Sequence, residues 1–151
     1  MRLALALAAE AAAEGEVPVG AVIVRQGEVI GTGRNRREKN RNALAHAEIE
    51  AINAACRRLG GWRLFGCELY VTLEPCPMCA GAIINARIDR VIYGAADPKA
   101  GSCGSMVNLF DLPYNHQPLL EGGMLAEECA AQLRSFFMAL RERQRTKKEK
   151  L

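Results

Sequence analysis

Two short motifs hold the side chains of this sequence that are best suited to chemistry. The first is HAE at residues 46–48, and the second is PCPMC at residues 75–79. Their imidazole and two thiols suit Zn²⁺, which binds histidine nitrogen and cysteine thiolate in a tetrahedral shell. Three protein ligands leave the fourth position to water, which is typical of a catalytic rather than a structural zinc. We therefore predict one zinc ion per chain, bound by His46, Cys76 and Cys79.

Glu48 supplies a carboxylate that this set of ligands does not need. Zinc lowers the pKa of bound water to about 7, which gives hydroxide at neutral pH. Hydroxide can attack an electron-poor ring carbon that bears an amino group. Glu48 can take the water proton, pass it to the ring nitrogen and then protonate the leaving amine. The expected reaction replaces an exocyclic amino group with a carbonyl and releases ammonia.

Both motifs fall at the starts of predicted helices. The first begins a helix over residues 45–59 that Gly60 ends, and the second begins a proline-led helix over residues 77–86. A helix N-terminus stabilises thiolates through its dipole and its free N–H groups. Because residues i and i+2 of a helix do not face each other, His46 and Glu48 can share a site only if their helix points at it end-on. We expect two helix N-termini to converge on the metal.

The remaining pattern alternates strands with helices, which is typical of a layered α/β domain. Strands 17–25 and 28–33 are joined by a Gln-Gly turn and form a hairpin, so the sheet is mixed. We expect an irregular polar loop over residues 34–43 and a long loop with one short helix over residues 94–116. The other expected elements are helices 2–14 and 125–147 and strands 67–73, 90–93 and 118–121.

Length and composition fit one globular domain over residues 1–151. Half of the residues are hydrophobic, a quarter are charged, and the net charge of +3 is too small for a polycation. Acidic residues interrupt the apolar N-terminus, so an Ala/Leu-rich helix explains it better than a signal peptide. No run of 18 apolar residues occurs, so we expect no membrane span. The six cysteines fit free thiols in a reducing compartment, which predicts a cytoplasmic protein.

Positive charge gathers at the C-terminus, where residues 141–151 carry six Lys/Arg and two Glu. Such a run is usually a solvated helix end, and residues 146–151 are expected to form a basic tail that can fray. The alternative function is contact with nucleic-acid phosphates.

The paired pattern H-x-E…P-C-x-x-C is the signature of zinc-dependent nucleobase deaminases. Over roughly residues 1–145, the sequence resembles the bacterial tRNA-specific adenosine deaminase family of the cytidine deaminase-like superfamily. Outside the zinc motifs, the resemblance rests on EVPVGAV at 16–22, NR at 35–36, LYVTLE at 69–74, AGA at 80–82, GAADPKAG at 94–101, NLF at 108–110, NH at 115–116 and FF at 136–137.

This resemblance implies a three-layer α/β/α fold with a mixed five-stranded sheet. It also implies a homodimer that converts the wobble adenosine of a tRNA anticodon to inosine, with Glu48 as proton shuttle. Asn35 would hydrogen-bond the flipped nucleotide, and the loop at residues 97–101 would contact its neighbours. Arg34 departs from the family, where an aromatic residue or histidine is common. The substrate-binding residues implied by the resemblance are Val17, Asn35, Ala47, Asp97, Lys99 and Phe137.

Several of these residues also have a structural interpretation. Asn35 can stabilise a turn, and Asp97 with Lys99 can form a solvated loop pair. We expect residues 136–137 to anchor the last helix in the core and Trp62 to be a packing residue. The apolar segment 79–84 should be fully buried or lie partly at a subunit contact.

Three other functions stay open. A structural zinc needs a fourth ligand such as Cys67, Cys103 or His116, and it leaves Glu48 unexplained. A zinc-stabilised binding module has no need of Glu48 either. A deaminase of a free base or nucleoside, such as cytosine, cytidine or guanine, shares the zinc motifs, because pocket shape sets ring identity.

Overall fold

The structure is a computed structural model that describes residues 1–151. Five strands form one mixed sheet in the order β2-β1-β3-β4-β5. Strand β1 pairs antiparallel with β2 and β3, whereas β3 with β4 and β4 with β5 are parallel. The strands are β1 (Gly20–Arg25), β2 (Glu28–Arg34), β3 (Cys67–Leu73), β4 (Arg90–Ala95) and β5 (Leu119–Gly122). The helices are α1 (Arg2–Ala13), α2 (Arg37–Asn40), α3 (Ala47–Leu59), α4 (Pro77–Ala86), the 3₁₀ helix η1 (Leu109–Asp111) and α5 (Ala126–Glu149).

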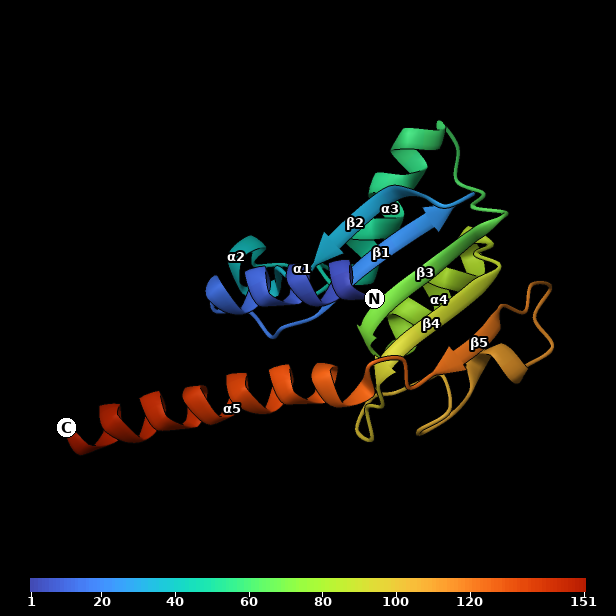
Figure 1. The fold of residues 1–151 in the computed structure, drawn as a ribbon. Helices are drawn as coiled ribbons and strands as arrows, with labels where there is room; N and C mark the ends of the chain where they lie inside the picture. The colour runs from blue at the N-terminus through green and yellow to red at the C-terminus, as the bar shows by residue number, and fades with distance from the viewer.

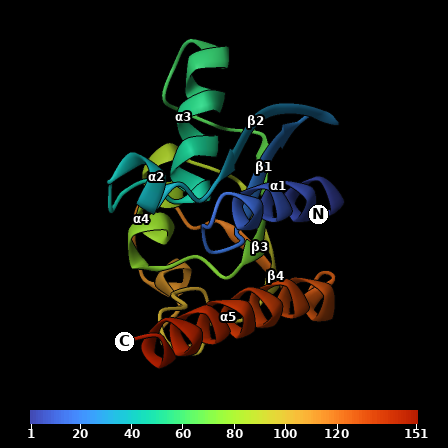
Figure 2. The same ribbon diagram turned by 90° about the vertical axis from the view of Figure 1, so that its left-hand side faces the viewer.

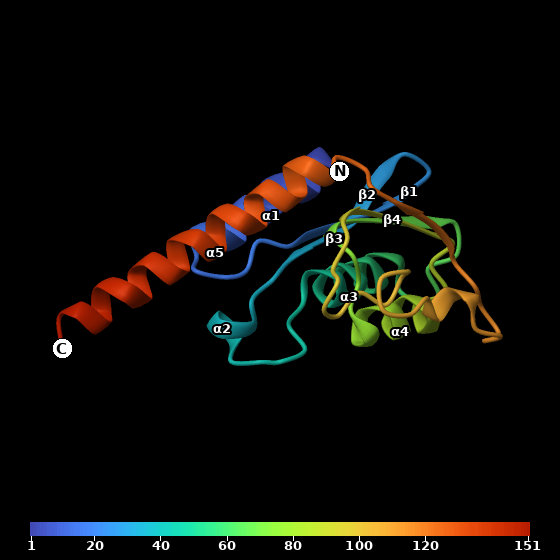
Figure 3. The ribbon, with the colours of Figure 1, turned by 90° about the horizontal axis from the view of Figure 1, so that it is seen from below.

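Helices cover both faces of the sheet. Helices α1 and α5 lie on one face, and α3 and α4 lie on the other (Figures 1 and 3). The three-layer α/β/α architecture with a mixed five-stranded sheet is therefore confirmed. Strand β3 lies at the centre of this sheet, and its Leu69 and Val71 are fully buried in the core between the layers.

Small residues bring α3 unusually close to the sheet. Ala47, Ala51 and Ala55 are fully buried on the face of α3 that packs on β2. A Cβ added at Gly33 would lie 2.2 Å from the carbonyl oxygen of Ala47, so this close approach requires glycine. The contact fixes the first turn of α3, which carries the HAE motif. At its other end, α3 stops at Gly60, which has a left-handed φ of 70°, as the sequence predicted.

Two predictions for the segments that flank the first hairpin were wrong. Strand β1 begins at Gly20 rather than at residue 17, because Pro18 has no N–H to contribute to the ladder. The segment 34–43 is not wholly irregular, since it includes the one-turn helix α2. The buried carboxylate of Glu16 accepts hydrogen bonds from the backbone N–H groups of Glu38 and Lys39 and so stabilises this turn.

The last helix is far less buried than expected for a helix that residues 136–137 anchor in the core. Cys129 is its only buried residue, and Phe137 is 39% exposed. Phe136 and Phe137 meet edge to face at 5.4 Å instead of entering the core. Helix α5 continues past the sheet as a projecting rod that ends in the basic segment (Figure 1). No helix combines the length and apolar character needed to cross a bilayer.

Candidate active site

Two helix N-termini bring the predicted metal ligands together. His46 is the N-cap residue of α3, and Cys76 is the N-cap residue of α4. Figure 2 shows α3 with its C-terminal end pointing away from the body of the molecule and its N-terminal end near α2. One potential ligand atom each from His46, Cys76 and Cys79 lies within 4.8 Å of the others.

The distances inside this cluster match zinc. Nδ1 of His46 lies 3.6 Å from Sγ of Cys76 and 3.5 Å from Sγ of Cys79. Zinc bonds of about 2.3 Å to sulfur and 2.0–2.1 Å to nitrogen, at a tetrahedral angle, place the two ligand atoms about 3.5 Å apart. One nitrogen equidistant from two sulfurs is the arrangement that a shared ion requires. The donor set and its spacing both fit Zn²⁺.

The cluster also favours thiolate. A hydrogen bond from the Cys79 thiol, aided by His46, lowers the pKa of Cys76 to about 4 even though burial opposes ionisation. The same shared contact, together with burial, raises the pKa of Cys79. Because both sulfurs must be deprotonated as ligands, zinc binding releases the proton that they share.

Glu48 lies at the same centre, as the end-on orientation of α3 requires. Its side chain is buried, and its Oε2 accepts a hydrogen bond from the Cys79 thiol at 3.2 Å. Desolvation by burial raises the pKa of Glu48 above that of an ordinary glutamate. His46 precedes the first helical residue and Glu48 is the second, so the two side chains reach one point at the helix end.

No further donor completes the cluster. His116 contacts the carbonyl oxygen of Ile88 through Nε2 at 2.7 Å, and the Cys67 thiol donates to a carbonyl oxygen. Burial raises the pKa of Cys103 to about 12. None of the three joins the group of potential ligands. The arrangement therefore has the three-donor composition of a catalytic site rather than the four donors of a structural one.

A pocket of about 460 Å³ opens in front of the cluster. His46, Glu48 and Cys76 form part of its wall, while Cys79 is fully buried behind them. All six residues that the family resemblance assigned to substrate also line it: Val17, Asn35, Ala47, Asp97, Lys99 and Phe137. Six separate segments of the sequence thus meet at one cavity. A pocket of this size can hold a nucleobase and its sugar.

Comparison with known proteins agrees with this geometry. The family model of the MafB19-like deaminases matches residues 1–141. A tRNA-specific adenosine deaminase of Bacillus subtilis is 46% identical over 152 aligned residues, which cover 100% of this chain and 94% of that protein. A solved structure from a study of A-to-I editing by tRNA deaminases at the wobble position superposes with a TM-score of 0.86. It is 48% identical, with 88% of this chain and 97% of that chain covered.

This chain belongs to the family of tRNA-specific adenosine deaminases. A related branch is also similar, since a solved guanine deaminase of Bacillus subtilis is 36% identical. The match has a TM-score of 0.63 and covers 93% of this chain and 90% of that one. The deaminase fold is therefore shared by proteins that are named for different bases, so the fold alone does not determine which base is the substrate.

Asn35 stabilises a turn, as one of its two sequence interpretations predicted, and it also lies in the pocket wall. It is buried, donates through Nδ2 to the carbonyl oxygen of Val17 at 3.3 Å, and accepts the Arg37 N–H through Oδ1 at 3.2 Å. It therefore stabilises a turn while it lines the pocket of the deaminase. The turn holds the amide in a fixed orientation in the wall.

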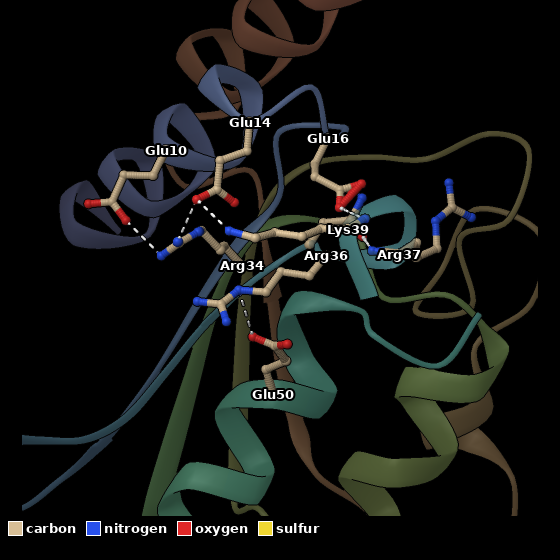
Figure 4. A network of polar contacts seen from close by, with 9 residues as sticks. Glu10, Glu14, Glu16, Arg34, Arg36, Arg37, Lys39 and Glu50 are labelled. Carbon is tan, nitrogen blue, oxygen red and sulfur yellow. Dashed lines mark hydrogen bonds and ion pairs between the residues drawn. The ribbon is translucent and has the colours of Figure 1, made fainter. Parts of the chain in front are cut away.

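Arg34 points away from this pocket. Its guanidinium forms ion pairs with Glu10 and Glu14 of α1 at 3.0 and 2.8 Å (Figure 4). The departure from the family at this position therefore ties the end of β2 to α1, and Arg34 is not among the pocket-lining residues.

Trp62 is another residue whose environment differs from the expectation. It is 51% exposed, and the Arg63 guanidinium lies 4.1 Å from its ring centroid. It is a surface residue and does not pack in the core.

Sequence reasoning missed several pocket residues. Among them are Arg37, Glu74 and Leu133, which all line the cavity. Arg37 follows Asn35 by two residues, and Glu74 directly precedes the PCPMC motif, so their positions beside named motifs were the available signal. Leu133 lies one helical turn before residues 136–137 on α5, the pair that was expected to anchor this helix in the core.

Proposed function

We propose that the chain is a zinc-dependent hydrolase that deaminates the wobble adenosine of a tRNA anticodon to inosine and releases ammonia. The observation that carries the proposal is the convergence of His46, Cys76, Cys79 and buried Glu48 at the wall of one nucleoside-sized pocket. Family membership supports the choice of adenosine in RNA over other amino-bearing rings.

The chain would bind one zinc ion through His46, Cys76 and Cys79. When bound, zinc supplies Lewis-acid activation of water. Glu48 accepts one proton from water and delivers it to the ring nitrogen beside the amino-bearing carbon. It then takes the second proton from the new hydroxyl group on that carbon and passes it to the amine, which leaves as ammonia while the carbonyl forms. Its raised pKa suits it to both accepting and donating a proton, and its burial excludes bulk water from the transfer.

The pocket wall fits a nucleotide that is part of a longer strand. Asn35 presents a side-chain amide whose orientation is fixed by Val17 and Arg37, and such a group suits hydrogen bonding to the flipped nucleotide. Arg37 and Lys99 are exposed cations at the pocket, where phosphates that flank the nucleotide can pair with them. Phe137 offers a partly exposed ring on which a base can stack.

The proposed assembly is a homodimer that acts on tRNA in the cytoplasm. The apolar helix α4 is mostly covered within the chain, with Ile83 and Ile84 buried. Large apolar side chains are exposed instead on the loop between β4 and β5, where Met106 is 66% exposed and Tyr114 is 51% exposed. These side chains support a subunit contact beside α4, which sedimentation at micromolar concentration tests, because a monomer mass contradicts it.

A deaminase of free guanine is the second candidate, favoured by the structural match to a guanine deaminase. The first candidate needs an adenosine that is part of an RNA strand, whereas the second acts on a free base. Zinc-loaded protein should be incubated separately with an anticodon stem-loop, free adenosine, cytidine and guanine. The proposal predicts ammonia release and inosine from the stem-loop alone. Turnover of guanine without turnover of the stem-loop would support the second candidate instead.

A further inference from the structure

Glu74 is a buried carboxylate that the proposed chemistry does not use. It is 2% exposed and has no ion-pair partner. All its hydrogen bonds come from one loop. Its Oε1 accepts the N–H of Asp97 at 3.2 Å and the hydroxyl of Ser105, and its Oε2 accepts the N–H groups of Cys103 and Ser105, each at 3.1 Å. A carboxylate that accepts so many donors fixes the geometry of all of them.

The loop wraps around this carboxylate closely. A Cβ added at Gly101 would lie 2.2 Å from Oε2 of Glu74 and 2.4 Å from the carbonyl oxygen of Asp97. Only glycine, which has no Cβ, therefore fits at position 101, where the loop passes the Glu74 carboxylate. Within the loop, Oδ1 of Asp97 accepts the N–H of Lys99 at 3.0 Å. Because Glu74 in turn holds the N–H of Asp97, it also fixes the position from which the Lys99 side chain extends.

The same loop forms one side of the substrate pocket, through Asp97 and Lys99. Glu74 lies one residue beyond β3 and two residues before the first cysteine of the metal cluster. It is thus rigidly attached both to the central strand and to the segment that presents the ligands.

We propose that Glu74 is a positioning residue that fixes the RNA-binding loop at residues 97–105 in its position relative to the metal cluster. Although Glu74 lines the pocket, the loop occupies both oxygens of its carboxylate, so it acts on binding through Asp97 and Lys99. This inference rests on the proposed function, because it assigns those two residues to the RNA substrate.

Glu16 offers a matched control on the other loop that lines the pocket. It is 1% exposed and accepts the backbone N–H groups of Glu38 and Lys39 at 2.9 and 3.3 Å, as Figure 4 shows. It therefore holds the turn next to Asn35 as Glu74 holds the loop at residues 97–105. The two carboxylates share no hydrogen-bond partner.

The test combines Glu74→Gln with Lys99→Ala in a double-mutant cycle on the zinc-loaded protein. An amide cannot accept donors on its nitrogen, so Glu74→Gln should release half of the loop contacts. We expect KM for an anticodon stem-loop to rise about tenfold, which equals roughly 1.4 kcal/mol of binding, while kcat stays within about threefold. In the Lys99→Ala background, the same substitution should add less than about threefold, because its effect passes through Lys99. Glu16→Gln combined with Lys99→Ala should instead be additive.

Hydrogen exchange separates this inference from the proposed function. Glu74→Gln should speed exchange of the Asp97, Cys103 and Ser105 amides without lowering zinc content, whereas Glu16→Gln should not. If wild-type protein fails to deaminate the stem-loop, the proposed function fails, and exchange still decides whether Glu74 holds the loop. Unchanged exchange, unchanged KM or full additivity with Lys99→Ala would overturn the positioning role. If Glu74→Gln does not fold, Gly101→Ala carries the same expectations, because it displaces the loop and leaves the carboxylate in place.

Discussion

Replacing Glu48 with glutamine isolates its proposed role as proton carrier. The amide keeps the shape of the side chain, so it can occupy the same buried position beside Cys79. The three metal ligands stay in place, so zinc content and fold should not change. What is lost is the ability to take up and release a proton, which is worth roughly 10²–10⁴ in rate.

The surroundings of Glu48 place the expected loss near the upper end of that range. Two other carboxylates line the pocket, Glu74 and Asp97. The oxygens of Glu74 are occupied by the loop at residues 97–105, and Oδ1 of Asp97 accepts the N–H groups of Lys99 and Ala100. The hydrogen bonds that both carboxylates accept come from this loop, whereas Glu48 contacts Cys79 of the metal cluster, so we expect neither to replace Glu48. We therefore expect kcat to fall about 10⁴-fold, or roughly 5 kcal/mol of transition-state stabilisation.

Single-turnover deamination of an anticodon stem-loop, measured with enzyme in excess, reports this chemical step directly. Zinc content and RNA affinity should be measured on the same preparations, and both should match wild type. Glu50→Gln is the matched control, because Glu50 lies on the same helix but pairs with Arg36 at 3.5 Å outside the pocket. A folded, zinc-loaded Glu48→Gln variant that turns over within about threefold of wild type would refute the proton-carrier role.

Other substitutions test the remaining parts of the site. Alanine at His46, Cys76 or Cys79 should lower zinc content well below one ion per chain and abolish deamination, as chelation of the wild-type protein should; full zinc retention in all three variants would contradict the ligand assignment. Asn35→Ala should keep its zinc but lower kcat/KM on the stem-loop by the equivalent of about 1–3 kcal/mol, because the nucleotide loses the buried amide proposed to hydrogen-bond it; an unchanged value would leave Asn35 a purely structural role. Truncation after Leu140 should raise KM more than it lowers kcat. It should also reduce the slope of log binding constant against log salt concentration, by somewhat under one unit for each lost phosphate contact. Equal KM and equal slope for the full-length and truncated proteins would assign the basic end to solubility.

The sequence predicted the architecture where local rules agree with one another. Gly60 ends α3, Pro77 begins α4, and β3 spans Cys67–Leu73 as its apolar pattern indicated. Both helix starts also coincide with metal motifs, so the cluster could be inferred from spacing together with the dipole argument. The alternation of strands and helices then fixed a layered fold.

The errors arose where distant contacts override local pattern. Helix α2 is stabilised by Glu16, which is more than 20 residues away from the N–H groups that it accepts, so no local motif reveals it. Residues 136–137 were expected to anchor α5 in the core, yet Phe137 is 39% exposed and lines the pocket, as the family resemblance implied, and Leu133 of the same helix lines it too. Glu74 preceded a recognised motif, but only the folded loop shows that its carboxylate is enclosed by backbone donors.

The central claim is tested most directly by locating inosine in the product. Two anticodon stem-loops should be compared that differ only in whether the single loop adenosine stands at the wobble position or one nucleotide away from it. After incubation with zinc-loaded protein, each RNA is digested to nucleosides and analysed by mass spectrometry. The account predicts inosine from the wobble RNA and none from the shifted RNA. Equal inosine from both RNAs, or none from either at full zinc occupancy, would contradict it.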